Sequence, residues 1–118
     1  LKAKRELKDN WKGIKILEAL SATGLRSCRY MKEIGVDINK ILSNDWDPKA
    51  AELIKKNFAF NDIPEEKTEV TSMDALDVMY ERRKLKDFYD VVDLDPYGTA
   101  TPFLDSSIQA LESGGLLC

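Results

Sequence analysis

Residues 14–26 read IKILEALSATGLR, and this stretch decides the fold class. Its apolar run over residues 14–20 predicts a strand, and the small residues of 21–24 predict a turn. Apolar residues then recur at helical spacing, and Gly35 is expected to end the helix. These apolar residues are Leu25, Cys28, Met31 and Ile34. A strand, a turn and a helix in this order form one unit of a parallel α/β sheet.

Two similar units follow along the chain. A strand over residues 40–45 leads to Asp47-Pro48, a predicted helix N-cap followed by proline at the first helical position. The buried face of that helix is expected to carry Ala50, Ala51, Leu53, Ile54 and Phe58. A weaker strand over residues 68–72 precedes a polar helix that extends through Lys84.

The fourth unit begins with an apolar strand over residues 88–95. Thr101-Pro102 is expected to open the next helix, and residues 113–115 to close it. The inward residues of that helix are predicted to be Phe103, Leu104, Ile108 and Leu111. A fifth strand near Leu116 and Leu117 would then form a short, exposed edge.

The repeated units predict a Rossmann-like, doubly wound parallel α/β sheet. Right-handed crossovers and a switch point beside the first strand favour the strand order 3-2-1-4-5, with helices on both faces. Because the chain stops at Cys118, directly after an apolar run, we interpret residues 1–118 as a partial domain that is truncated before its final strands. Residues 1–13 form a charged leader that is expected to be partly helical.

Composition narrows the function classes. The sequence of 118 residues is 43% hydrophobic and 33% charged, without a membrane-length apolar run or a signal peptide, which favours one soluble, intracellular domain. The nucleus, cytoplasm and mitochondrion are not distinguished. Because there is no His and the only cysteines, Cys28 and Cys118, are far apart, we expect no metal site and no disulfide framework.

The net charge of −3 has the wrong sign for a domain that grips nucleic acid by itself. Residues 2–15 and 81–86 are basic, although a solvated helix face is the simpler interpretation of each. An RNA partner would therefore be bound largely through other regions.

In an open parallel sheet, ligands bind at the carboxyl ends of the strands. The first turn holds a single glycine, Gly24, rather than G-x-G-x-x-G, which disfavours a pyrophosphate ligand. Small residues such as Ser21 and Gly24 still let the backbone approach a ligand. Arg26 is placed to pair with the carboxylate of a methionine moiety, although an ordinary turn with a surface arginine explains the same pattern.

Acidic residues follow the next two strands. Asp45 is a candidate acceptor for ribose hydroxyls, and it is left free for that role because Asp47 is better placed as the helix cap. Asp74 is a candidate acceptor for an adenine amino group, with the Ala75 backbone amide reaching a ring nitrogen. A simple cap for the helix that begins near Ala75 is the competing interpretation of Asp74.

The fourth strand ends in Asp95-Pro96-Tyr97-Gly98, which resembles the (Asp/Asn)-Pro-Pro-(Tyr/Phe) signature of methyltransferases that act on exocyclic amines. The second proline is absent. The Asp95 carboxylate and the Pro96 carbonyl would accept the two N–H groups of a guanine N2 and point its lone pair at a methyl donor. The Tyr97 ring would stack on the flipped base.

Together these motifs resemble the tRNA (guanine-N2) dimethyltransferase family, which modifies position 26 of tRNA. The match spans residues 16–118 and is carried by residues 17–27, 43–45, 93–99, 102–105 and 114–118. The resemblance implies that the sheet is of the class I methyltransferase type, and that two methyl groups are transferred from S-adenosylmethionine to one guanine N2. It implies cofactor residues at Arg26, Asp45, Asp74 and Ala75, and base-facing residues at Asp95, Pro96 and Tyr97. The N-terminal segment and C-terminal domain of the family are missing from residues 1–118, so this piece alone is expected to be inactive.

Three alternatives stay open at this point. A methyltransferase of another amine, such as a DNA adenine or a protein glutamine, would use the same strand exits. A nicotinamide-dependent dehydrogenase shares the strand-helix pattern but would need the glycine fingerprint. A nucleotide-binding module without catalytic activity would also fit the fold.

Overall fold

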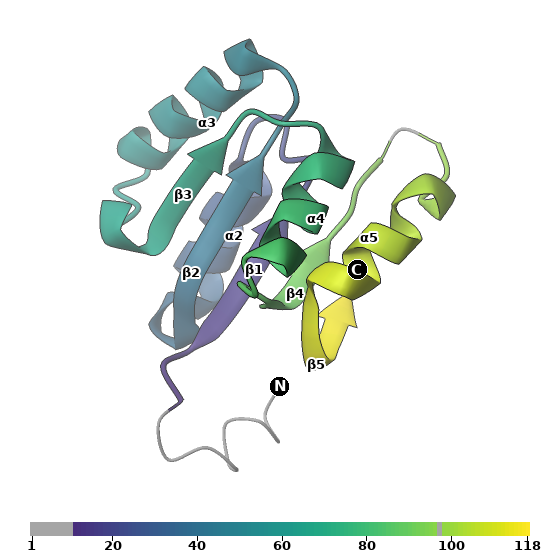
Figure 1. The fold of residues 1–118 in the computed structure, drawn as a ribbon. Coiled ribbons are helices and arrows are strands. Elements are labelled where there is room, and N and C mark those ends of the chain that lie inside the picture. The colour runs from purple at the N-terminus through teal and green to yellow at the C-terminus, as the bar shows by residue number, and fades with distance from the viewer. Residues whose placement is uncertain (1–10, 97) are drawn as a thin grey trace.

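The computed structural model describes residues 11–96 and 98–118, and a five-stranded parallel sheet forms its middle layer (Figure 1). The strand order β3-β2-β1-β4-β5 confirms the predicted winding. The strands are β1 (Ile14–Glu18), β2 (Ile38–Asn44), β3 (Thr68–Thr71), β4 (Tyr89–Asp93) and β5 (Leu111–Leu117). Most of the charged leader, together with Tyr97, lies outside the described residues.

Helices cover both faces of the sheet. Helices α2 (Leu25–Ile34) and α3 (Pro48–Phe60) lie on one face, and α4 (Ala75–Lys84) and α5 (Leu104–Ala110) lie on the other (Figure 1). Short 3-10 turns connect them at η1 (Gly35–Asp37), η2 (Glu65–Lys67) and η3 (Thr101–Phe103). None of the described helices is both long enough and apolar enough to cross a membrane.

Alternation along the strands produces two separate cores. On β1, Ile16 packs with the core under α2 and α3, whereas Leu17 packs with the core under α4. The pairs Ile41 and Leu42 on β2, and Val91 and Val92 on β4, divide between the two cores in the same way. Because both faces of the central strands are buried, their sequences are nearly continuous apolar runs.

Capping residues set the starts of two helices, at Asp47 as the sequence predicts and at Asp74 by the interpretation that competed with its adenine role. The Asp47 side chain accepts a hydrogen bond from the Lys49 amide at 2.9 Å, and Pro48 is the first residue of α3. The Asp74 side chain accepts one from the Leu76 amide at 2.8 Å at the start of α4. Gly35 follows the last residue of α2, but with right-handed backbone angles, and the chain continues directly into η1.

The prediction for α5 was wrong in its bounds and partly wrong in its buried face, since Phe103 and Leu111 pack against the core as predicted. The helix ends at Ala110, before the glycines, and Leu104 and Ile108 are exposed. Its buried residues are Ser106, Ser107 and Ala110, and both serine hydroxyls donate to the Phe103 carbonyl. The small serine side chains let α5 lie close to α4. Their burial is tolerated because each hydroxyl group makes a hydrogen bond to the nearby backbone.

Other apolar residues that were expected to face inward are also partly exposed. These are Leu25 and Ile34 on α2 and Leu53 on α3. The buried apolar residues of the two helices form narrower stripes: Cys28 and Met31 on α2, and Ala51, Ile54 and Phe58 on α3. The helical period was therefore right, but the width of the buried face was overestimated.

Strand β5 is longer than predicted and irregular. It begins at Leu111, and its register against β4 shifts between Tyr89 and Val91, so residues 112–115 bulge out of the ladder. Gly114 has a φ of 75°, and a Cβ on Gly115 would lie 2.9 Å from the Asp90 carbonyl oxygen. These two glycines permit the bulge where they were expected to close a helix.

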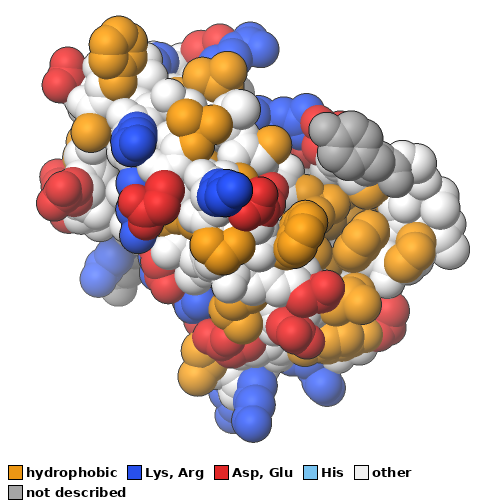
Figure 2. Space-filling view, turned by 90° about the horizontal axis from the view of Figure 1, so that it is seen from above, with side chains coloured by type: hydrophobic (Ala, Val, Ile, Leu, Met, Phe, Trp, Pro, Cys, Tyr) orange, Lys and Arg blue, Asp and Glu red, His pale blue; other side chains and the backbone are white. Residues whose placement is uncertain are grey.

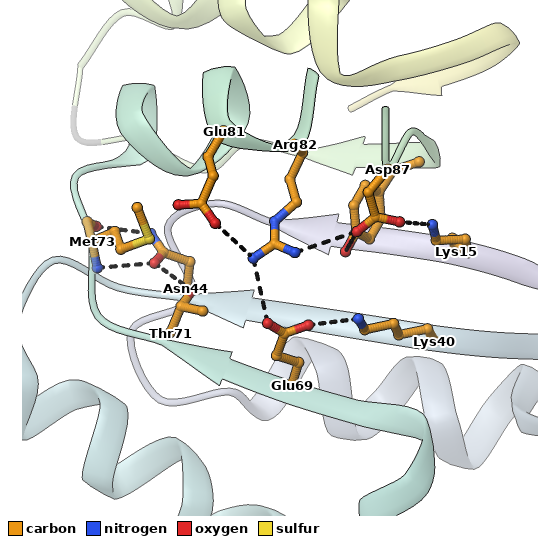
Figure 3. Close-up of polar contacts among 10 residues, drawn as sticks. Lys15, Lys40, Asn44, Glu69, Thr71, Met73, Glu81, Arg82 and Asp87 are labelled. Carbon is orange, nitrogen blue, oxygen red and sulfur yellow. Dashed lines mark hydrogen bonds and ion pairs between the residues drawn. The ribbon is translucent and has the colours of Figure 1, made fainter. Parts of the chain in front are cut away.

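A network of charged residues lies between α4 and the sheet (Figure 3). Arg82 is 7% exposed and contacts Glu69 at 3.4 Å, Asp87 at 3.3 Å and Glu81 at 3.5 Å. Lys15 pairs with Asp87 and Lys40 with Glu69. A buried charge requires such partners, so Arg82 fastens α4 to the sheet. In the basic segment of residues 81–86, Arg83, Lys84 and Lys86 are exposed, as expected for a solvated helix face, whereas Arg82 is buried.

Candidate functional site

The carboxyl ends of β1, β2 and β4 meet at one edge of the sheet. Glu18 is level with Ser43 on β2 and with Asp93 on β4. Figure 2 views this edge from above, with hydrophobic side chains among acidic and basic ones. A cavity of about 420 Å³ opens here, within the size range of small-molecule sites. It is lined by Glu18, Leu20, Ser21, Ala22, Thr23, Arg26, Asp45, Trp46, Asp95, Pro96 and Phe103.

The turn after β1 forms one wall of the cavity. Its Ser21 amide donates to the Asn44 carbonyl at 2.7 Å, which ties the turn to the end of β2. Gly24 closes the turn with a φ of 74°, and a Cβ there would lie 3.0 Å from Ile54 Cγ2 on α3. Glycine is therefore required at this position by its backbone conformation and by helix packing, not by direct lining of the cavity.

Arg26 lies in the first turn of α2 and lines the cavity, as the sequence predicts. Its Nη1 donates to Asp93 Oδ1 at 2.7 Å, and its Nη2 donates to Asp95 Oδ2 at 2.9 Å. A guanidinium group has five N–H donors, so these two contacts leave donors for a ligand carboxylate. The arginine thus joins the last residue of β4, Asp93, to the predicted base-facing acid Asp95.

Asp45 also lines the cavity and does not cap α3, a role that Asp47 takes as predicted, but its carboxylate accepts two other hydrogen bonds from the protein. Its Oδ2 accepts from the Ala22 amide at 2.9 Å, and its Oδ1 accepts from the Asp47 amide at 3.0 Å. The two bonds fix the carboxylate between the turn after β1 and the start of α3. An ionised carboxylate has about four acceptor positions, so further hydrogen bonds to hydroxyl groups can be made.

The remaining predicted residues divide into two groups. Asp95 and Pro96 line the same cavity as Arg26 and Asp45. Asp74 and Ala75 lie at the start of α4 and do not line it. The contact that the structure gives Asp74 is the helix cap, and Ala75 is buried in the core under α4.

Glu18 is a buried carboxyl group at the exit of β1 that the predicted site residues do not include. It is 4% exposed and accepts a hydrogen bond from Ser27 Oγ, which also contacts Ser43 Oγ at 2.7 Å. The pKa of Glu18 is raised to about 7, mainly by burial; the hydrogen bond from Ser27 opposes this rise, and the nearby Asp93 adds to it. The Ser21 hydroxyl contributes to lowering this pKa but makes no hydrogen bond of normal geometry. This edge therefore holds a carboxyl group poised to change charge near neutral pH.

Replacing Glu18 by Gln is expected to change how stability depends on pH. The native pKa of about 7 lies above the unfolded value of 4.5, so folding binds a proton and stability falls as pH rises through this window. Above pH 7 the wild type carries the full cost of a buried charge, at most about 3 kcal/mol. Glu18→Gln should remove that cost while leaving stability near pH 4 unchanged. Urea unfolding of both proteins from pH 4 to pH 8 measures the difference, and parallel pH profiles would contradict the assignment.

Several cavity residues were missed by sequence reasoning. Trp46 directly follows Asp45 and is 71% exposed, which is unusual for a tryptophan. This exposure cannot be predicted from the sequence. Phe103 was assigned to a buried helix face, and Leu20 to the end of the first strand. Glu18 was detectable in principle, because it is a lone acid within an apolar strand.

The whole chain, residues 1–118, matches the family model described as N2,N2-dimethylguanosine tRNA methyltransferase. The chain belongs to this family. It is 46% identical over 104 residues to the mitochondrial tRNA (guanine(26)-N(2))-dimethyltransferase of Saccharomyces cerevisiae, covering 88% of the chain and 18% of that protein. It is 39% identical over 106 residues to the Homo sapiens tRNA (guanine(26)-N(2))-dimethyltransferase, covering 90% and 16%.

A solved structure is similar to this chain in both fold and sequence. The fold is similar to that of Trm1 from Pyrococcus horikoshii, solved in complex with S-adenosyl-L-methionine, with a TM-score of 0.77 and 31% identity. The similarity covers 88% of the chain and 30% of that protein. The chain thus spans less than a third of the length of each of these relatives.

Proposed function

We propose that this chain forms the cofactor-binding part of an S-adenosylmethionine-dependent enzyme that methylates the exocyclic N2 of guanine 26 in tRNA, first once and then twice. The observation that carries the proposal is the shared cavity, in which Asp95 and Pro96 face the same space as Arg26 and Asp45. Relatives named for this reaction support the substrate, and a relative solved with S-adenosyl-L-methionine supports the cofactor.

The cavity fits the chemistry of this cofactor. Asp45 and Arg26 line it together. Asp45 would accept hydrogen bonds from ribose hydroxyls, and the spare donors of Arg26 would bind the methionine carboxylate. Glu18, once ionised, would pair with the α-ammonium group, and the buried Ser21 hydroxyl offers a further polar contact. S-adenosylmethionine supplies an electrophilic methyl group when bound, and the single-glycine turn holds no pyrophosphate cradle that would favour a dinucleotide.

We propose that Asp74 and Ala75 contact the adenine ring of the cofactor beyond the cavity. They lie at the exit of β3, directly after the strand that pairs with β2, so adenine would extend from Asp45 along the edge of the sheet. The exposed Trp46 ring stands at the cavity wall beside Asp45 and offers an apolar face for that ring. The cap bond to Leu76 occupies Asp74 Oδ1, which leaves Oδ2 for an amino group.

Asp95 and Pro96 would orient the base. A guanine N2 is a weak nucleophile because its lone pair is delocalised into the ring, so accepting its N–H bonds raises its electron density and directs it toward the methyl group. We infer catalysis chiefly by positioning, with Asp95 as an acceptor and with proton loss after methyl transfer. The proposed role of Tyr97 is to stack on the base.

The partner is tRNA, and most of its binding is assigned to parts of the enzyme outside residues 1–118. The net charge of −3 does not favour phosphate binding, and Arg82 and Lys15 are already paired with acids. The chain by itself is expected to bind cofactor without methylating RNA. No metal is part of the proposal, and no group of three metal-binding side chains occurs within residues 11–96 and 98–118.

Replacing Asp45 by Ala is expected to weaken binding of S-adenosylhomocysteine by about 1 to 3 kcal/mol, because charge-assisted hydrogen bonds are worth that much. Calorimetric titration of both proteins with S-adenosylhomocysteine and, separately, with NAD measures this effect and the choice of cofactor. Asp62→Asn is a suitable control, because Asp62 lies in the turn after α3 and does not line the cavity. Tighter binding of NAD would overturn the proposed function, and unchanged affinity of Asp45→Ala would remove Asp45 from the site.

A further inference from the structure

A chain of contacts leads from the buried end of β4 to Asp95. Tyr30 Oη on α2 donates to Asp93 Oδ2 at 2.5 Å, and Arg26 Nη1 donates to Asp93 Oδ1 at 2.7 Å. The other terminal nitrogen of Arg26, Nη2, donates to Asp95 Oδ2 at 2.9 Å. Both oxygens of Asp93 are therefore used, and one arginine spans the two acids.

The two acids differ greatly in burial. The Asp93 side chain is 2% exposed and belongs to β4, whereas the Asp95 side chain is 68% exposed and lies beyond the end of the strand. An exposed ion pair alone fixes a side chain weakly, because water and side-chain entropy compete with it. Here Arg26 is held from its other side by a buried acid, which cannot release its partner without leaving a charge unpaired. Asp93 therefore makes Arg26 a rigid support for Asp95.

With this support, one carboxylate oxygen of Asp95 can accept a hydrogen bond from the substrate. Arg26 engages Oδ2, and no hydrogen bond from the described residues engages Oδ1. A carboxylate held at one oxygen presents the other in a defined direction. Positioning at this level matters, because misplacing a reacting group by about 1 Å costs about 100-fold in rate.

We propose that Asp93 is a positioning residue, which acts through Arg26 to hold Asp95 in the orientation that receives the guanine amine. Tyr30 supports Asp93 from the second oxygen. This assignment rests on the proposed function, since it concerns the same cavity. It gives Arg26 two tasks, contact with the cofactor carboxylate and support of Asp95, and so connects the cofactor and base sides of the site.

A double-mutant cycle in the complete enzyme tests the assignment. Asp93→Asn, Asp95→Asn and the double variant are compared in single-turnover methylation of tRNA at saturating S-adenosylmethionine. If Asp93 acts through Asp95, Asp93→Asn should slow the reaction by about 10-fold to 100-fold. The double variant should then be no more than about 3-fold slower than Asp95→Asn, because coupled residues are not additive. Asp62→Asn, with the same change of side chain outside the cavity, should react at the wild-type rate.

Tyr30→Phe is a milder substitution for a second double-mutant cycle, because it leaves the Asp93 carboxylate and Arg26 unchanged. It should slow methylation a few-fold in the wild-type background and have no effect in the Asp95→Asn background. Multiplicative losses in both cycles, as expected from general destabilisation, would overturn the positioning role while leaving Asp95 in the site. An unchanged rate in Asp95→Asn itself would overturn both this assignment and the proposed base site.

Discussion

Replacing Asp95 by Ala in the complete enzyme is expected to slow single-turnover methylation of tRNA by about 100-fold to 1000-fold, as losses of positioned transition-state contacts do. Asp95→Asn should fall between Ala and the wild type. Asparagine keeps an acceptor oxygen but loses the negative charge that stabilises the developing ammonium, whereas alanine loses both. Affinity for S-adenosylmethionine should change little in either variant, because the side chain is assigned to the base.

Asp77→Ala is a suitable control for this series, since Asp77 is an exposed acid on α4 that does not line the cavity. Its rate should match the wild type. Dimethylation by Asp95→Ala at the wild-type single-turnover rate would show that the exit of β4 is not the catalytic site. A loss that appears only in cofactor affinity would instead place Asp95 on the cofactor side of the cavity.

Replacing Asn44 by Ala is expected to lower the free energy of unfolding by about 3 to 5 kcal/mol, the range for breaking a buried polar network. Asn44 is fully buried, and its side-chain amide donates to the Ala19 and Met73 carbonyls at 3.0 and 2.9 Å. Its oxygen accepts from Thr71 Oγ1 at 2.7 Å and from the Met73 amide at 3.1 Å (Figure 3). Every donor and acceptor position of the side chain is used, and the bonds join the ends of β1, β2 and β3.

Urea unfolding measures this loss, with Asn61→Ala as the control. Asn61 is partly exposed, and its side chain makes one bond, to the Asn57 carbonyl, so its removal should cost less than about 1.5 kcal/mol. Binding of S-adenosylhomocysteine should weaken in Asn44→Ala, because Asp45 and the turn after β1 lose their common anchor. Equal losses in the two variants would contradict the role of Asn44 as the link between the strand ends.

The strand order and the two-faced sheet were predictable because local signals agreed with each other. Apolar runs marked β1 and β4, and Asp47-Pro48 marked the start of α3. The end of α5 was not predictable in this way. Serines at 106 and 107 take the buried positions there by bonding to the Phe103 carbonyl, whereas the apolar Ile108 is exposed. Apolar periodicity cannot detect a helix face built from small polar residues.

The location of the site was predictable because the carboxyl ends of parallel strands lie at the same edge of the sheet. That rule placed Arg26, Asp45 and Asp95 at one edge, and the structure brings all three to one cavity. Contacts across the edge depend on register and on side-chain direction, which the sequence does not specify. The Arg26 bridge from Asp93 to Asp95 and the fixing of Asp45 by backbone amides are of this kind.

Incubating the complete enzyme with tRNA and methyl-labelled S-adenosylmethionine, followed by analysis of the nucleosides and the labelled position, tests the proposed methylation of guanine N2. N2-methylguanosine should appear early and N2,N2-dimethylguanosine later, both at position 26. Label on adenine, on a ring nitrogen of guanine or on protein, with none on guanine N2, would contradict it.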